Sequence, residues 1–90
     1  MNFEWDRTKA ERNLAKHGVT FDEAASVFLD TQSRTIFDEN HSESEDRYLT
    51  LGFSSRGRLL IVWFTMRGEA VRIIGARKPE RHEQRGYPDE

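Results

Sequence analysis

Residues 59–77, which read LLIVWFTMRGEAVRIIGAR, carry the strongest strand signals of the chain. Leu59–Thr65 is apolar on both alternating faces, as in a strand at the centre of a sheet. Arg67-Gly68 then has the composition of a tight turn, and Glu69–Arg77 alternates between apolar and polar residues. These residues therefore predict an antiparallel hairpin whose first strand is central.

Two further strands are predicted upstream of this hairpin. Arg47–Phe53 alternates in hydropathy, and a turn at residues 54–57 leads from it into the central strand. Thr35–Phe37 is a shorter candidate, separated from it by the polar, acidic segment Asp38–Asp46. Short turns between consecutive strands favour an antiparallel β-meander.

The N-terminal third shows helical periodicity after a short strand at Met1–Trp5. Asp6 is suited to cap a helix over Arg7–His17, and Gly18 is suited to end it. A second helix is expected to run from residue 20 to near residue 30. It opens on a capping box in which the hydroxyl of Thr20 accepts from the amide of residue 23, and the Glu23 carboxylate reaches back.

A last, short helix is expected over Glu80–Arg85, with Pro79 at its first position. The predicted order is therefore β-α-α-β-β-β-β-α. We expect an α+β domain in which the meander packs against the two N-terminal helices.

Composition narrows the class of protein. A length of 90 residues predicts one domain over residues 1–90. Because the chain contains no cysteine, it has no disulfides, no thiolate metal site and no cysteine nucleophile. The longest apolar run, Leu59–Phe64, is too short to cross a bilayer, and Met1–Asp6 lacks the apolar core of a signal peptide. We therefore expect a soluble, cytoplasmic protein with no membrane partner.

Charge is distributed unevenly along the chain. Residues 1–46 hold 5 Lys/Arg and 11 Asp/Glu, whereas residues 47–90 hold 9 and 5. A basic half can bind phosphates while an acidic half contacts a basic partner, although composition alone favours an ordinary solvated surface.

No metal or cofactor site is predicted. His17, His41 and His82 lack the spacing of metal ligands, and the glycines form no phosphate-binding loop. The acidic segment at residues 38–46 has groups that could bind a cation, but a solvated loop is the favoured interpretation. Nothing in the sequence supports a Ser/His/Asp triad.

Arginines supply the clearest functional candidates. Arg72 and Arg77 stand among apolar residues of the last strand, where charge is unusual unless it is paired or used. Their opposite parity places them on opposite faces of a regular strand. Arg77 adjoins Lys78, Arg81 and Arg85 in a basic cluster suited to phosphate. The alternative is an ion pair of Arg77 with the acidic loop beside an ordinary charged helix.

A second candidate group stands where the acidic loop meets a strand. Glu45 and Arg47 share a face on an extended segment, so one can accept a proton while the other stabilises phosphate charge. The alternative is a weak surface ion pair. His17 could transfer protons near neutral pH, or simply interact with the C-terminus of its helix.

Several short segments, in order between residue 2 and about residue 87, match one known family. They are Phe3-Glu4-Trp5-Asp6, Lys16-His17-Gly18-Val19, Phe21-Asp22-Glu23-Ala24, Glu45-Asp46-Arg47-Tyr48, Gly52, Ser55-Arg56-Gly57-Arg58-Leu59-Leu60 and Arg72-Ile73-Ile74-Gly75-Ala76-Arg77. With this set the chain resembles the BrnT family, the ribonuclease toxins of type II toxin–antitoxin modules, which share a RelE-like fold.

The resemblance implies a metal-independent endoribonuclease that cleaves cellular RNA and arrests translation and growth. It also implies a BrnA-like antitoxin, typically encoded beside the toxin, which neutralises it in a heterotetramer and makes the contacts to operator DNA. The catalytic candidates that it implies are His17, Glu45, Arg47, Arg72 and Arg77, with Lys16 and Trp5 as further site residues. RNA binding is expected at Lys16, Lys78 and Arg81.

Two other classes of function remain open. A partner-binding module without catalysis would modulate a DNA-binding antitoxin, and its growth effect would not depend on Arg77 or His17. An RNA-binding domain without turnover would need Arg47 and Arg77 but not Glu45 or His17, because only catalysis requires proton transfer.

Overall fold

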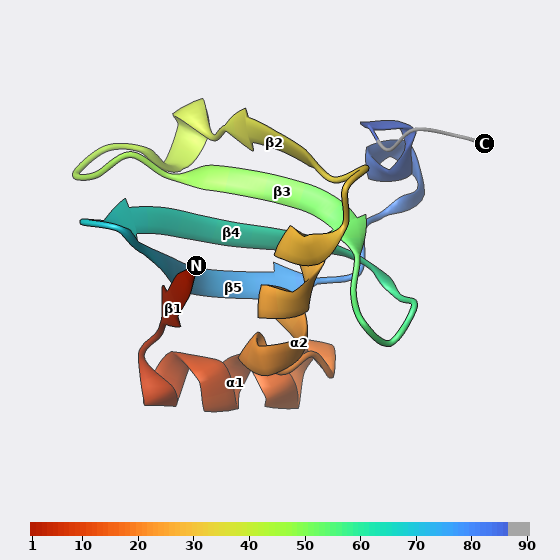
Figure 1. The fold of residues 1–90 in the computed structure, drawn as a ribbon, viewed down its shortest axis with the longest axis horizontal. Coiled ribbons are helices and arrows are strands. Elements are labelled where there is room, and N and C mark those ends of the chain that lie inside the picture. Colours follow the sequence, from red (N-terminus) through yellow and green to blue (C-terminus); the bar gives the residue numbers. More distant parts are fainter. Residues whose placement is uncertain (87–90) are drawn as a thin grey trace.

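The computed structural model describes residues 1–86 and contains one five-stranded sheet with a layer of helices on one side (Figure 1). The strand order is β1-β5-β4-β3-β2, so β4 is central as predicted. The strands are β1 (Asn2–Glu4), β2 (Arg34–Phe37), β3 (Tyr48–Phe53), β4 (Leu59–Arg67) and β5 (Ala70–Arg77). The α+β class is therefore confirmed, whereas the relation to RelE stays a prediction.

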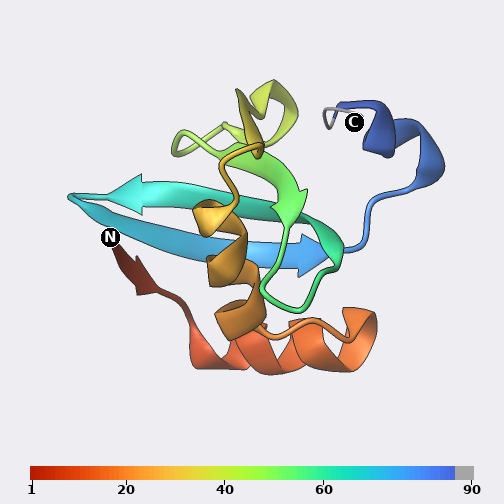
Figure 2. The same cartoon turned by 45° about the vertical axis from the view of Figure 1, so that its right-hand side comes forward.

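Two α-helices and three short 3₁₀ helices accompany the sheet. They are α1 (Arg7–His17), α2 (Phe21–Ser26), η1 (Val27–Leu29), η2 (Glu39–His41) and η3 (Arg81–Gly86). Figure 2 shows α1 and α2 together on one side of the sheet, at a distance from η3. No helix within residues 1–86 combines the length and the apolar character that crossing a membrane requires.

The sheet is mixed, which corrects the expectation of a purely antiparallel meander. The strands from β2 to β5 do pair in antiparallel fashion, but β1 pairs with β5 in parallel, with Phe3 opposite Val71. The physical reason is the connection between β1 and β2. The helices carry the chain across one face of the sheet from one edge to the other, so β1 needs no hairpin partner.

Local capping signals determine the helix ends. The Asp6 carboxylate accepts from the amide of Thr8 at 2.8 Å at the start of α1. Gly18 ends this helix with a φ of 71°, a left-handed conformation that glycine adopts without strain. The Thr20 hydroxyl accepts from the amide of Glu23 at 3.0 Å, as the capping box predicts.

The prediction that the Glu23 carboxylate reaches back to complete this capping box is wrong. The Glu23 carboxylate accepts from the Ser54 hydroxyl at 2.7 Å and from Nε of Arg58 at 2.8 Å, so it reaches the β3–β4 turn instead of Thr20. Glu23 is only 5% exposed. The hydrogen bond from Arg58 holds the pKa of this carboxyl below its usual value, against the opposing effect of burial. An ion pair between buried Glu23 and half-buried Arg58 therefore joins α2 to the β3–β4 turn.

The core lies between the helix layer and the central strands. Its buried members are Val19, Phe21, Ala24, Val27, Leu60, Val62, Phe64, Val71, Ile73 and Ala76. On β4 these are the even-numbered residues from 60 to 64, so the odd-numbered side chains of this strand face away from the helices.

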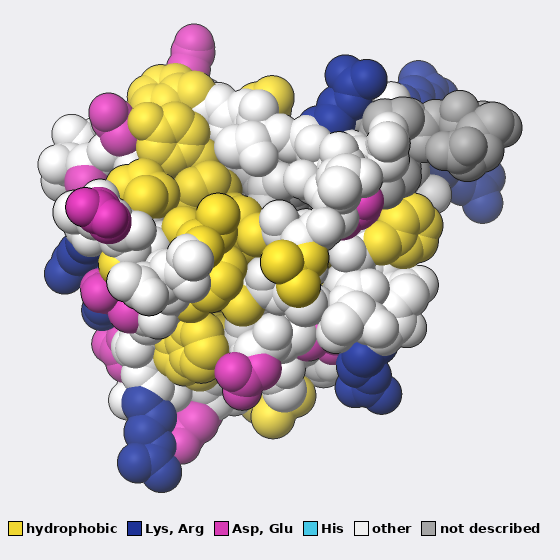
Figure 3. Space-filling model, in the orientation of Figure 1, with side chains coloured by type: hydrophobic (Ala, Val, Ile, Leu, Met, Phe, Trp, Pro, Cys, Tyr) yellow, Lys and Arg dark blue, Asp and Glu magenta, His cyan; other side chains and the backbone are white. Residues whose placement is uncertain are grey.

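A row of five aromatic rings crosses the helix side of the sheet, and we refer to it as the aromatic row. Ring centroids are 5.3 Å apart for Phe3 and Phe28, 5.0 Å for Phe28 and Phe64, 5.6 Å for Phe64 and Tyr48, and 5.6 Å for Tyr48 and Phe37. Phe37, on the edge strand β2, is 45% exposed. Figure 3 shows hydrophobic side chains gathered into a continuous band on this side of the molecule.

The C-terminal helix differs from the prediction. It is a 3₁₀ helix that begins at Arg81, with Pro79 outside it. The amide of Glu80 donates to the Glu83 carboxylate at 2.7 Å, which satisfies a backbone donor where the helix begins.

Candidate functional site

The side of the sheet that faces away from α1 and α2, which we call the open face, is hollowed. A groove of about 420 Å³ lies on this face. Its lining is mostly apolar, and Arg34 and Glu83 stand at its rim. The apolar lining residues are Ile36, Leu49, Leu51, Ile61 and Trp63.

A β-bulge in β5 determines which side chains reach the open face. Trp63 of β4 lies opposite Gly75, but the next residue, Phe64, lies opposite Ile73. Ile74 is therefore an extra residue without a counterpart on β4. The alternation of side chains along β5 changes phase at this point.

The bulge places Arg72 and Arg77 on the same side of the sheet. Arg72 lies opposite Thr65 and Arg77 opposite Ile61. Thr65 and Ile61 are four residues apart on β4, so both face away from the helices, and the two arginines do the same. The sequence-based expectation of opposite faces was wrong because it assumed a regular strand.

Arg77 is held by three groups. Its guanidinium pairs with both carboxylate oxygens of Glu83, at 2.9 and 3.0 Å, and donates to the carbonyl of Lys78 at 3.0 Å. Its Cζ lies 5.1 Å from the ring centroid of Trp63, in cation–π range. The paired guanidinium lowers the pKa of Glu83 to about 2, and the carboxylate raises that of Arg77.

The partner of Arg77 thus comes from η3, and the alternative pairing with the acidic loop is not observed in the described part of the chain. Sequence reasoning missed Glu83 and also Trp63. The signal for Trp63 was available, since it lies on the central strand in the phase opposite to the core residues. The pairing of Glu83 depends on how the terminal segment folds back, which no local pattern records.

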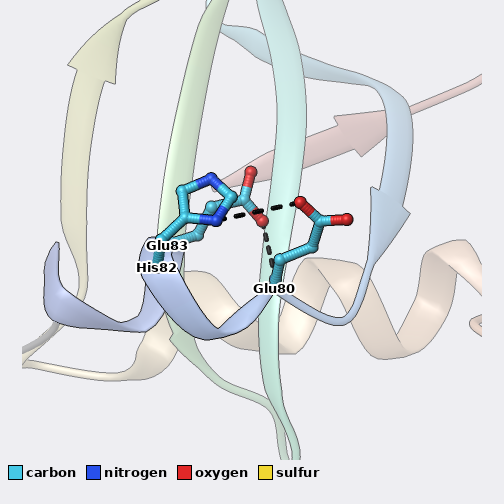
Figure 4. Close-up of side chains that lie close together, drawn as sticks. All are labelled: Glu80, His82 and Glu83. Carbon is cyan, nitrogen blue, oxygen red and sulfur yellow. Dashed lines mark hydrogen bonds and ion pairs between the residues drawn. The ribbon is translucent and has the colours of Figure 1, made fainter.

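Three residues of the C-terminal segment bring together ligand-type atoms, as Figure 4 shows. Atoms of Glu80, His82 and Glu83 lie within 4.8 Å of one another. The Glu83 carboxylate is already engaged by Arg77 and by the amide of Glu80, and Nδ1 of His82 lies 3.9 Å from the Glu80 carboxylate. These contacts form a charge network in which Glu83 holds Arg77.

Arg72 is half-buried and pairs with an acid on the neighbouring strand. Its Nη1 lies 2.9 Å from the Glu4 carboxylate of β1. Glu4 and Arg72 are direct partners in the parallel pairing, so this contact also determines the register of β1.

Arg47 lies in a second, smaller pocket on the open face. This pocket has a volume of about 260 Å³ and is lined by His41, Arg47, Trp63, Ile74 and Gly75. Nε of Arg47 is buried and has no hydrogen-bond partner in the described structure. Trp63 lines both pockets, so it connects the surroundings of Arg47 with those of Arg77.

The segment that precedes Arg47 is tied to β4. The Thr65 hydroxyl donates to the carbonyl of Asp46 at 2.6 Å. Thr65 lies opposite Arg72 on β5. Asp46, which stands between Glu45 and Arg47, is therefore fixed to the end of the sheet where Arg72 lies. No ion pair joins Glu45 to Arg47 in residues 1–86, and Glu45 is half-buried.

The acidic segment is more ordered than a solvated loop. Asp38 is 8% exposed, and its carboxylate lies 2.8 Å from Nδ1 of His41. The Ser42 hydroxyl donates to the carbonyl of Asp38 at 2.6 Å and accepts from the amide of Arg47 at 2.9 Å. Sequence reasoning missed this pair, although an Asp and a His three residues apart can meet across one helical turn.

The remaining predicted site residues lie elsewhere. His17 and Lys16 occupy the last turn of α1, on the helix side of the sheet, so the structure does not bring them together with the open-face arginines. This position also suits the helix C-terminus, which attracts positive charge. Lys78 follows β5 and Arg81 begins η3, and both are exposed.

Comparisons with known proteins agree with this architecture. A family model described as a ribonuclease toxin, BrnT, of type II toxin–antitoxin systems matches residues 5–83. The crystal structure of the Brucella abortus ribonuclease toxin BrnT is similar, with a TM-score of 0.69 and 23% sequence identity. The match covers 90% of this chain and 99% of that one. No curated protein matches the chain.

Proposed function

Because the chain belongs to the BrnT family of ribonuclease toxins of type II toxin–antitoxin systems, we propose that it is a metal-independent endoribonuclease. It cleaves cellular RNA in the cytoplasm and thereby inhibits translation and growth. Residues 1–90 act as one toxin domain, and no cofactor takes part.

The observation that carries this proposal is the arrangement of Arg47 and Arg77 around Trp63 on the open face. Guanidinium groups match the oxygens of a phosphodiester, and the half-buried indole of Trp63 provides a surface on which an unpaired base can stack. Arg72, on the same face, adds a third cation. Lys78 and Arg81 extend the positive charge beyond the end of β5.

RNA carries its own nucleophile, so the protein needs to supply only proton transfer and charge stabilisation. Attack of the 2′-hydroxyl on the adjacent phosphorus produces a 2′,3′-cyclic phosphate and a 5′-hydroxyl end. Arg47 and Arg77 stabilise the charge of the phosphorane, a role in which removal of one donor typically costs ~10²–10³ in rate. Of the two proton-transfer candidates, we assign the base to Glu45, which is half-buried two residues before Arg47, because His17 lies on the helix side.

The proposal is tested by incubating purified protein with RNA in the presence of EDTA. We expect wild type to cleave, Arg77→Ala and Arg47→Ala to lose ~10²–10³ in rate, and Arg12→Ala to behave as wild type because Arg12 is exposed on α1. A need for divalent metal, or 5′-phosphate ends, would contradict the mechanism. If folded wild type is inactive alone, the same assay on translating ribosomes separates a ribosome-dependent nuclease from a non-nuclease.

The partner that we propose is a BrnA-like antitoxin, which forms a heterotetramer with the toxin and alone contacts operator DNA. A type II toxin implies an antitoxin. Phe37, the exposed end of the aromatic row, directly precedes the acidic segment 38–46. Together they offer an apolar surface with negative charge beside it. Exposed apolar surface of this kind is typical of protein–protein contacts.

The same observation favours the second candidate function, a non-catalytic module that modulates a DNA-binding antitoxin. The two are separated by growth assays of cells that produce the protein without antitoxin. Growth arrest that requires Arg47 and Arg77 supports the nuclease, whereas arrest that survives both substitutions, or no arrest, supports the module.

A further inference from the structure

The Asp38–His41 pair has the geometry of a proton-transfer group and lies beside the cations of the open face. Asp38 is buried, while the side chain of His41 is 63% exposed. The Asp38 carboxylate lies 2.8 Å from Nδ1 of His41 and so orients the imidazole, while Nε2 takes no part in this contact. A buried carboxylate behind an exposed imidazole is the arrangement that fixes the tautomer of a catalytic histidine.

The support for Asp38 is itself rigid. Its amide donates to the carbonyl of Arg47 at 2.8 Å, and its carbonyl accepts from the Ser42 hydroxyl at 2.6 Å. These bonds close the segment 38–47 into a loop whose two ends are joined at the start of β3. The loop therefore holds His41 in a defined position relative to Arg47.

His41 and Arg47 line the same pocket, with Trp63, Ile74 and Gly75 as its other walls. The charged groups that face His41 are thus Asp38 from its own turn and Arg47, the residue before β3, since the walls from β4 and β5 are uncharged. The buried Nε of Arg47 has no hydrogen-bond partner among residues 1–86, and a phosphate oxygen in this pocket would provide one. An imidazole can transfer a proton and a guanidinium can stabilise phosphate charge, and cleavage of a phosphodiester uses both roles.

We propose that His41 is the general acid of RNA cleavage and that Asp38 is its positioning residue. This inference rests on the proposed nuclease function and completes it with the group that protonates the leaving oxygen. The Glu45 carboxylate takes the proton of the 2′-hydroxyl, O2′ forms its bond to phosphorus, and the P–O5′ bond breaks. The leaving O5′ receives the proton that Nε2 carries in the imidazolium form of His41, while the Nδ1 proton stays toward Asp38. Exchange with solvent then returns a proton to His41 and removes one from Glu45.

The test uses two RNA substrates that differ at one atom. In the first the leaving atom is the natural 5′-oxygen, and in the second it is a bridging 5′-sulfur, which departs as a thiolate without a proton. On the natural substrate we expect His41→Ala to lose ~10²–10⁴ in kcat. On the sulfur substrate it should cleave within about tenfold of wild type, because general acid catalysis is no longer needed.

Two further variants make the result specific. Asp38→Asn should show a smaller loss with the same recovery on the sulfur substrate, which a purely structural role would not produce. Glu45→Gln should be slow on both substrates, because its proposed step precedes departure of the leaving group. Asn40→Ala is the matched control, at the exposed position before His41 on η2, and should equal wild type on both.

The outcomes separate the two proposals. If wild type cleaves neither substrate, alone or with ribosomes, the nuclease function fails and the role of His41 fails with it. If wild type cleaves but His41→Ala is unaffected, or its loss persists with the sulfur substrate, only the assignment of the general acid is overturned. Thermal unfolding of each variant confirms that it is folded, and His41→Gln replaces His41→Ala if the latter is not.

Discussion

The carboxamide of Asn13 bonds both backbone groups of Ala76, donating to the carbonyl at 2.8 Å and accepting from the amide at 3.1 Å. The short strand β1 pairs with β5 only as far as Arg72, so among residues 1–86 no strand lies beside Ala76 on that edge. The side chain of Asn13 takes the place of one. It also donates to the carbonyl of Val19 at 3.0 Å and thus joins α1, the following loop and the end of β5.

Replacing Asn13 with Asp should destabilise the fold. Aspartate has the same size but cannot donate, so the carbonyls of Val19 and Ala76 lose their partner and a carboxylate is buried. We expect a loss of about 2–3 kcal/mol in the free energy of unfolding, measured by urea denaturation. Asn40→Asp, at an exposed position on η2, is the control and should change stability by no more than about 0.5 kcal/mol. Equal stabilities for the two variants would contradict the role of Asn13.

Glu83 should make the fold sensitive to acid. Its pKa is lowered from 4.5 to about 2 in the folded protein, chiefly by the hydrogen bonds from Arg77. Between these two pH values the unfolded chain binds a proton that the folded chain does not, so stability falls as the pH falls through this window. Urea unfolding at several pH values should show a shallower decline for Glu83→Gln than for wild type. Glu69→Gln, in the exposed β4–β5 turn, should keep the wild-type slope.

Gly52 should not tolerate a side chain. A Cβ at this position would lie 2.8 Å from Cβ of Ser33 and 3.1 Å from Cγ1 of Val27, and neither atom is at the end of a flexible chain. We expect Gly52→Ala to cost about 1–3 kcal/mol through overpacking, seen as a lower thermal midpoint. At Gly75 an added methyl group would have Oδ1 of Asn13 as its nearest neighbour, 3.7 Å away. Gly75→Ala should therefore leave stability nearly unchanged, and a comparable loss there would show that space is not the cause.

The ion pair of Glu23 and Arg58 should determine the order of the β3–β4 turn. Glu23→Gln keeps the shape of the side chain but removes the charge that accepts from Arg58 and Ser54. We expect a loss of about 1–3 kcal/mol and faster hydrogen exchange at the amide of Ser55, which is bonded to Ser26 in α2. Exchange at amides of the central strand should change only as far as global stability does.

Features that depend on neighbouring residues in the chain were predictable from the sequence. Asp6 and Thr20 mark helix starts because a short oxygen-bearing side chain can satisfy free amides there. Gly18 marks a helix end because its φ is positive. The hairpin between β4 and β5 was visible in the same way, with Gly68 at a φ of 59° in a two-residue loop.

Features that depend on pairing between distant segments of the chain were not predictable from the sequence. The bulge at Ile74 exists only in relation to Trp63 and Phe64 on the next strand, and the sequence of β5 alone reads as a regular alternation. The parallel position of β1 likewise depends on how the helices cross the sheet. Among the candidate site residues, the arginines are visible in the sequence because charge among apolar residues is conspicuous. The Asp38–His41 pair was hidden because it stands among other acids.

The bulge at Ile74 also has a consequence for how the chain can vary in length. If Ile74 were deleted, Arg72 and Arg77 would stand four positions apart in a regular strand and would still share the open face. If a residue were instead inserted between them without a second bulge, the first half of the strand would turn over, and Arg72 would point into the core while its apolar neighbours faced water. The strand β5 can therefore lose the bulged position more readily than it can gain another.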